Sequence, residues 1–284
     1  MTRAIHDALG WARDAVQARI IGQIFAQRVQ GIVLKGGMAF RVAHPKWARA
    51  TKDIDLDSDP EVSLGSLQKT VRQAIRRATM DGLLENVVIT EPKQTETTAR
   101  WKISGLYPRT GQTLHLTVEV SRRDKVHDEQ IRHVYDGPEI DDLITVYTDR
   151  TLAFKKVQAL LSETREAARD ISDLFLLIQA HVDPPVAELQ EWLATAPGPV
   201  WEQLWAKLDR MDFDTFRTQV LPSLPPTPDG QMLYRDWEEM RLKVGTHVED
   251  WLRRAGKTVD RTGLAPSLGS ACPPPVLHAR AGGP

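Results

Sequence analysis

Three aspartates alternate with apolar residues at positions 53, 55 and 57, and Ile54 and Leu56 lie between them. Strict alternation is typical of a β-strand, in which successive side chains point to opposite faces, so we expect the three carboxylates to share one face. Like charges at this spacing repel one another unless a cation or solvent compensates them. Because Mg²⁺ usually binds one or two carboxylates together with substrate phosphates, Asp53 and Asp55 are candidate metal ligands. For this motif taken alone, the alternative is an acidic edge strand in water.

A second alternating segment, residues 112–121, carries Glu119 on the face opposite its apolar residues. If this strand lies beside the aspartate strand with its apolar face on the same core, Glu119 can join Asp53 and Asp55. Two metal ions bridged by three carboxylates are the apparatus of phosphoryl and nucleotidyl transfer. Considered by itself, Glu119 would be interpreted as a solvated strand residue.

Lys35-Gly36-Gly37 follows a short apolar run, residues 32–34, that indicates a buried strand. Glycines after a strand let backbone N–H groups approach a phosphate, and the N-terminus of a following helix favours negative charge. The turn is not a Walker A loop, because no GxxxxGK[ST] sequence is present. Its position before the aspartate strand makes it a candidate phosphate-binding turn.

The glycine turn, the aspartate strand and the later glutamate together resemble the DNA polymerase beta-like nucleotidyltransferase superfamily. More narrowly, residues 34–40 (LKGGMAF) and 49–56 (RATKDIDL) are similar to the AbiEii/AbiGii-type nucleotidyltransferase toxins, which include the MenT proteins. Met38 stands where that family usually has Thr, and Thr51 where it usually has Ser. The resemblance implies that Lys35, Gly36, Gly37 and Thr51 contact the nucleotide.

Two later segments are similar to further motifs of the same family. Residues 152–160 (LAFKKVQAL) match its lysine-bearing helix, and residues 169–174 (RDISDL) match its R-D-x-x-D-L helix. The resemblance implies that Lys156 binds the triphosphate, with Lys155 as the alternative, and that Asp173 and Asp170 belong to the site. Asp173 precedes a very apolar run and therefore needs a partner such as Arg169 or Lys156. The alternative for both aspartates is a structural ion pair that holds two helices together.

The remaining pattern predicts an α+β fold: a polymerase beta-like mixed sheet flanked by helices, followed by a helical C-terminal domain. Apolar spacing predicts helices over 4–29, 38–43 and 62–80, and strands near 86–91, 98–104 and 112–121. We expect a nucleotidyltransferase domain at 1–147 and a helical domain at 148–254. Residues 255–284 lack apolar periodicity, so we predict a disordered tail there.

Composition excludes several other classes of protein. The 284 residues carry a net charge of −1, which excludes a globally basic, histone-like binder. Cys272 is the single cysteine, so neither an intramolecular disulfide nor a cysteine-rich zinc site can form. With no long apolar run and no signal-peptide pattern, we expect a soluble cytoplasmic protein that does not interact with a membrane.

The sequence therefore predicts an Mg²⁺-dependent nucleotidyltransferase that moves NMP from an NTP to an acceptor hydroxyl. In this hypothesis Asp53, Asp55 and Glu119 hold Mg²⁺, and Glu119 helps to deprotonate the acceptor. The resemblance implies an RNA acceptor such as a tRNA 3′ end, and a separately encoded antitoxin as partner. Two alternatives remain: a DxD glycosyltransferase that uses a nucleotide sugar, and a non-catalytic binding protein on the same fold.

An RNA acceptor would need a basic surface. Arg100 and Lys102, together with the arginines at 72, 76 and 77, are candidates for such a surface. The alternative is a solvated helix face.

Overall fold

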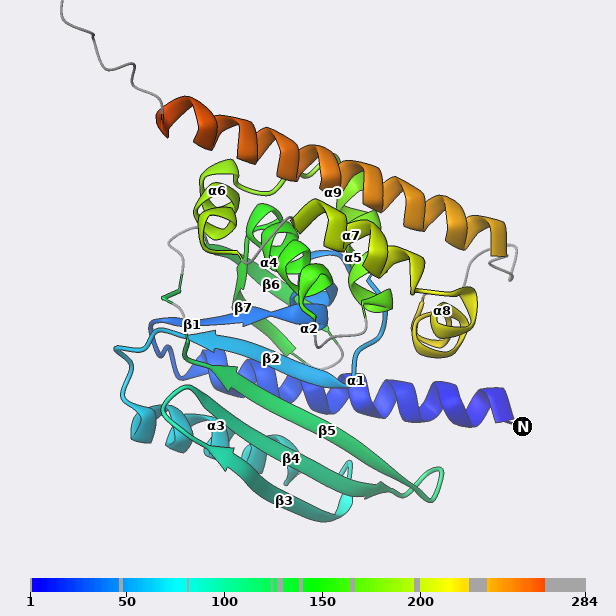
Figure 1. Ribbon diagram of the computed structural model, residues 1–284. Helices are drawn as coiled ribbons and strands as arrows, with labels where there is room; N and C mark the ends of the chain where they lie inside the picture. Colours follow the sequence, from blue (N-terminus) through cyan, green and yellow to red (C-terminus); the bar gives the residue numbers. More distant parts are fainter. Residues whose placement is uncertain are drawn as a thin grey trace, which may run out of the picture.

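The computed structural model describes residues 2–45, 48–80, 82–123, 125–126, 130–137, 140–163, 167–196, 200–224 and 234–263. In this part of the chain, seven strands form one mixed sheet with the order β3-β4-β5-β2-β1-β7-β6 (Figure 1). They are β1 (Ile32–Lys35), β2 (Asp53–Ser58), β3 (Glu85–Gln94), β4 (Thr98–Tyr107), β5 (Gln112–Ser121), β6 (Gln130–Gly137) and β7 (Ile140–Tyr147).

The aspartate motif occupies a central strand. β2 pairs with β1 on one side in antiparallel orientation and with β5 on the other in parallel orientation. The edge-strand interpretation of the aspartates is therefore wrong. Ile54 and Leu56 are fully buried and anchor the motif in the core, as the alternation predicts.

Two helices cover one side of the sheet. α1 (Thr2–Ala26) and α3 (Leu64–Thr79) pack against each other, and α1 also contacts β5 and β7 (Figure 1). The short α2 (Gly36–Ala43) packs against β1, β2 and β7. Apolar side chains from these helices and the strands form one core that includes Ile20, Val71 and Trp101.

The C-terminal helices surround a second apolar core, which includes Leu174, Phe216 and Trp237. They are α4 (Asp149–Leu161), α5 (Ala168–Gln179), α6 (Val186–Thr195), α7 (Val200–Asp209), α8 (Phe213–Gln219), the 3₁₀-helix η1 (Leu221–Ser223) and α9 (Tyr234–Gly263). The long α9 contacts α5, α6, α7 and α8 (Figure 1). None of the described helices is long and apolar enough to cross a membrane.

The mixed sheet flanked by helices and the helical C-terminal region confirm the predicted fold class. Two details differ. The hairpin β6–β7 was not predicted, because residues 130–147 mix charged and apolar residues without clean alternation. The helix α9 runs to Gly263, past residue 255, where the tail was predicted to begin. The rest of that segment, including Cys272, lies outside the described residues.

Gly245 tests the packing of α7 against α9. A Cβ atom there would lie 2.7 Å from Leu208 Cδ1 and 2.8 Å from Trp205 Cη2. Gly→Ala normally stabilises a helix by about 1 kcal/mol, but overpacking a core contact costs about 1–3 kcal/mol. We expect Gly245→Ala to lower the free energy of unfolding measured in urea.

Gly256 of the same helix is the matched control, because nothing lies within 4 Å of its added Cβ. Gly256→Ala should therefore leave stability unchanged or raise it. Equal stability of the two variants would contradict the close packing at Gly245.

Candidate active site

Strand register brings four charged residues into one row. Lys35 of β1 pairs with Asp55 of β2, Asp55 pairs with Glu119 of β5, and Glu119 pairs with Arg100 of β4. Side chains at directly paired positions lie on the same face of a sheet. The predicted neighbourhood of Asp55 and Glu119 is therefore confirmed.

The carboxylates of Asp53 and Asp55 have no hydrogen bond or salt bridge to any described residue, although both side chains are only partly exposed. Burial raises the pKa of Asp55 above its ordinary value, and repulsion from Asp53 and Glu119 raises it further, while Lys35 partly opposes the shift. Cations lie near the pair, but among the described residues none is bonded to its carboxylate oxygens. Unpaired oxygen ligands that repel each other are a donor set suited to a divalent cation.

The glycine turn, Gly36-Gly37, packs closely against Asp55 of this pair. Gly36 has φ +65°, and a Cβ atom on it would lie 2.5 Å from Asp55 Oδ2. A Cβ on Gly37 would lie 3.2 Å from Arg49 Nη2 and 3.3 Å from Thr51 Oγ1. Only glycine at position 36 permits both this backbone conformation and the approach to the carboxylate.

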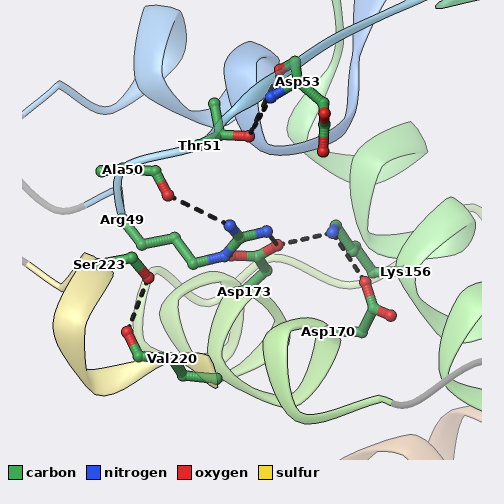
Figure 2. Close-up of polar contacts among 9 residues, drawn as sticks. All are labelled: Arg49, Ala50, Thr51, Asp53, Lys156, Asp170, Asp173, Val220 and Ser223. Carbon is green, nitrogen blue, oxygen red and sulfur yellow. Dashed lines mark hydrogen bonds and ion pairs between the residues drawn. The ribbon is translucent and has the colours of Figure 1, made fainter. Parts of the chain in front are cut away.

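Four charged side chains form a buried network beneath the turn (Figure 2). Arg49 donates from Nε to Asp173 Oδ1 at 3.1 Å and from Nη2 to Asp173 Oδ2 at 3.2 Å. Lys156 Nζ lies 2.6 Å from Asp173 Oδ2 and 2.8 Å from Asp170 Oδ1. Two cations therefore meet two carboxylates, which balances the charge of the network away from solvent.

The pKa shifts in this network follow from that balance. Burial by itself would raise the pKa of Asp173, but Lys156 and Arg49 together lower it below the ordinary value. Burial would likewise lower the pKa of Lys156, but Asp173 and Asp170 raise it. Asp173 and Lys156 are thus both held in their charged forms.

The network also ties the loop before β2 to the helical region. Arg49 lies in this loop, whereas Lys156 belongs to α4 and Asp173 to α5. The next residue, Ala50, donates its backbone N–H to the carbonyl of Ser223 at 2.6 Å. The loop that leads into the aspartate strand is therefore fixed by both halves of the chain.

The expected three-carboxylate cluster is not assembled in this structure. Glu119 Oε2 accepts a hydrogen bond from Arg100 Nε at 2.6 Å. Among the described residues, no group of three His, Cys, Asp or Glu side chains is arranged to hold a metal ion. Asp53 and Asp55 nevertheless fit such an ion through their unpaired oxygens, and Glu119 would have to leave Arg100 to join them.

A family model described as "Nucleotidyl transferase AbiEii toxin, Type IV TA system" matches residues 23–261. The chain belongs to this family. No curated protein sequence matches it significantly.

Two solved structures share the fold of this AbiEii chain. The crystal structure of JHP933 from Helicobacter pylori is 18% identical, covers 89% of this chain and 96% of its own, and has a TM-score of 0.53. The structure of a "putative nucleotidyltransferase from H. pylori" is 21% identical, covers 84% of this chain and 93% of its own, and has a TM-score of 0.50.

The AbiEii sequence motif does not decide which of two adjacent lysines is the motif lysine, and the structure shows that their surroundings differ. Lys156 is buried and bound by two aspartates, whereas Lys155 is partly exposed and pairs with Asp57. The predicted partner of Asp173 is confirmed for Lys156. Sequence reasoning missed Arg49 as a second partner, although its place in the RATKDIDL motif was a signal. It also gave no role to Asp57.

Asp173→Asn tests the buried network of this AbiEii protein. Removing one carboxylate leaves Arg49 without its bidentate partner, and breaking a buried pair costs about 3–5 kcal/mol. We expect a loss of that order in the free energy of unfolding at pH 7. Asp214→Asn, which breaks an exposed pair with Arg217, is the matched control and should cost less than about 1 kcal/mol.

The loss should also depend on pH. The pKa of Asp173 is lower in the folded protein, so its stabilisation is complete above the unfolded-state value of about 3.9 and is lost as the pH falls through the folded value. Denaturation curves of wild type and variant should therefore converge below about pH 4. A gap that stays constant down to acid pH would contradict the assignment of the ionised partner.

Proposed function

We propose that this AbiEii nucleotidyltransferase transfers NMP from an NTP to a hydroxyl of an RNA, with Mg²⁺ held by Asp53 and Asp55. The single observation that supports the metal site is the pair of neighbouring carboxylates without a cationic partner, on a central strand. The bound ion would polarise the reacting phosphate and offset its developing charge. A tRNA 3′ end is an acceptor of the required chemistry.

The transfer itself balances as a displacement at phosphorus. The acceptor oxygen forms a bond to the α-phosphorus, the bond from that phosphorus to the bridging oxygen breaks, and pyrophosphate leaves. The hydroxyl proton passes to a base, for which Glu119 is our candidate because it lies beside Asp55. In this role Glu119 exchanges its contact with Arg100 for the acceptor.

We propose that Gly36, Gly37 and Thr51 bind the phosphates of the nucleotide. The close approach of Gly36 to Asp55 places the backbone of the turn next to the proposed metal ligands. Lys156, Asp170 and Asp173 then support the turn through Arg49, which lies against Gly37. Direct contact of Lys156 with the triphosphate stays a prediction.

An acceptor RNA would reach the site along the open face of β3, β4 and β5. A second row of paired residues runs from Asp53 to Thr117, then to Lys102 and Thr90. The last three line a pocket together with His115. Lys102 and His115 are exposed, so this face offers positive charge and hydroxyl groups beside the proposed reaction centre.

The expected basic surface is thus smaller than the sequence indicated. Arg72 forms a salt bridge with Glu91, and Arg100 pairs with Glu119. Lys102 has no hydrogen bond or salt bridge within the described residues, which makes it the best candidate contact for a phosphate of the acceptor.

Further proposals concern organisation and partners. We propose a nucleotidyltransferase domain at residues 1–147 and a helical domain from residue 148, supported by the two apolar cores. Membership of a type IV toxin–antitoxin family supports an antitoxin as partner. A cytoplasmic location of this protein stays a prediction.

Label transfer tests the proposed reaction. We expect the protein, with Mg²⁺ and total RNA, to incorporate label from an α-labelled NTP, and we expect Asp53→Asn and Asp55→Asn each to reduce incorporation by at least about 100-fold, as loss of a group that stabilises transition-state charge does. Wild-type rates in either variant would contradict the assignment. Turnover of a nucleotide sugar would support a glycosyltransferase, and binding without turnover would support a non-catalytic protein.

Lys102→Gln tests the acceptor face separately. We expect it to raise the apparent KM for RNA several-fold and to weaken its salt dependence, because one phosphate contact is lost, while KM for NTP stays unchanged. Lys69→Gln, which removes an exposed lysine of α3, is the control and should change neither. An unchanged KM for RNA in Lys102→Gln would place the acceptor elsewhere.

A further inference from the structure

The open face of β3, β4 and β5 continues past the start of the strand that carries the aspartates. β2 pairs with residues 117–121 of β5, so residues 112–116 extend beyond it together with their partners on β4 (Figure 1). On this extension, Val88 of β3, Ser104 of β4 and His115 of β5 are paired in one row. Paired residues lie on the same face of a sheet, so these three side chains point to the same side.

A pocket lies between this row and the neighbouring row of Thr90, Lys102 and Thr117. Its volume is about 400 Å³, which is within the range of small-molecule sites. Among the described residues that line it there is no carboxylate, and Lys102 supplies the formal charge. Hydroxyl groups come from Thr90, Ser104 and Thr117. The pocket therefore does not repel an anionic ligand, and it offers both donors and acceptors to a polar one.

Two exposed side chains of the lining suit the face of a flat ring. Val88 is 55% exposed, and the imidazole of His115 is also exposed. Within the described part of the chain, the side chain of His115 has no hydrogen bond or ion pair, and neither has that of Ser104. Histidine rings stack on unpaired bases, and such stacking tolerates any base. An imidazole, an apolar side chain and several hydroxyls together match a nucleobase, which has apolar faces and a polar edge.

The order of the strands places this pocket on the acceptor's side of the proposed reaction centre. The glycine turn follows β1, on one side of Asp55, and Glu119 of β5 lies on the other side. The nucleotide phosphates are proposed to lie at the turn, so the pocket is across the carboxylates from them. Thr117 pairs with Asp53 and lies two residues, about 7 Å, from Glu119 along the strand. A ribose can bridge this gap, which would bring the hydroxyls of a nucleotide whose base is in the pocket to the carboxylates.

We propose that this pocket binds the unpaired 3′-terminal base of the acceptor RNA, with His115 stacked on the base and the hydroxyls of Ser104 and Thr117 at its polar edge. The inference rests on the proposed function and narrows the acceptor to RNA with a single-stranded 3′ end. A paired base cannot enter, because its neighbours cover its faces and its partner covers its edge. Hydroxyl groups both donate and accept hydrogen bonds, so the pocket accepts different bases.

Two RNAs of equal charge isolate the contribution of the base. One is a hairpin with a short unpaired 3′ overhang, and the other is the same hairpin with an abasic terminal nucleotide, which keeps every phosphate and the terminal hydroxyls. In anisotropy titrations of the full-length protein without NTP, we expect the intact overhang to bind at least about fivefold more tightly, the low end for one base–aromatic stack. A blunt hairpin should show no such gain. Equal affinity of the wild type for the intact and the abasic overhang would overturn the proposal.

His115→Asn should remove the preference for the intact overhang and leave the affinity for the abasic RNA unchanged. His181→Asn is the matched control, because His181 is an exposed histidine far along the chain whose positive φ of 56° asparagine accepts. It should keep the full preference. Val88→Thr, which makes an exposed apolar side chain polar at nearly constant shape, should reduce the preference and serves if His115→Asn does not fold. A preference that survives in both pocket variants would overturn the proposal.

Steady-state kinetics distinguish the terminal base of the acceptor from the base of the incoming NTP, which has the same chemistry. We expect His115→Asn to raise KM for RNA several-fold, with KM for NTP unchanged. A raised KM for NTP with unchanged affinity for RNA would show that the pocket holds the base of the incoming nucleotide, and would overturn the proposal.

The label-transfer assay separates this proposal from the proposed function. Asp55→Asn should lose transfer and keep the preference for the intact overhang. A wild type with that preference that labels no RNA would refute RNA nucleotidylation and leave the pocket in place. A wild type that binds and labels intact and abasic RNA equally well would refute the pocket and leave the reaction in place.

Discussion

Repulsion between the unpaired carboxylates of Asp53 and Asp55 is the constraint on which the rest of the site depends. The apolar residues between and after them, Ile54 and Leu56, are buried in the core, so the strand cannot turn its acidic face away. Hydrogen bonds to β1 and β5 fix its register on both sides. Because the fold forces these charges together, a cation between them and a substrate phosphate would relieve the repulsion.

The other carboxylates around the site differ from Asp53 and Asp55 because each has a cationic partner. Asp57 has two lysines and a tyrosine, and Glu119 has Arg100. Asp173 has Arg49 and Lys156. Each of these carboxylates is satisfied by the chain itself, and most of their cationic partners come from other elements. Charge is thus neutralised around the site while its centre is left acidic, and these ion pairs connect the glycine turn and the strand to α4 and α5.

The sequence was sufficient to predict the fold class and the elements of the site, because alternation and ordered motifs carry that information. It offered β2 beside β5 as the condition for a carboxylate site, and Lys156 as one of two candidate partners of Asp173; the structure has both. It could not predict partners such as Arg49 with Asp173 or Asp57 with Lys155, because those depend on how α4 and α5 pack onto the sheet. The sequence also did not predict the hairpin β6–β7 or the last turns of α9, because neither segment has a clear apolar period.

The most direct test of the account is the thermal stability of wild type and Asp55→Asn, with and without Mg²⁺ and NTP. If Asp55 is a metal ligand, the variant without ligand should be at least as stable as the wild type, since repulsion is relieved. Mg²⁺ with NTP should then raise the melting temperature of the wild type only, through linkage. A variant that is destabilised without ligand, or that gains as much as the wild type from Mg²⁺ and NTP, would show that Asp55 is a structural residue and not a metal ligand.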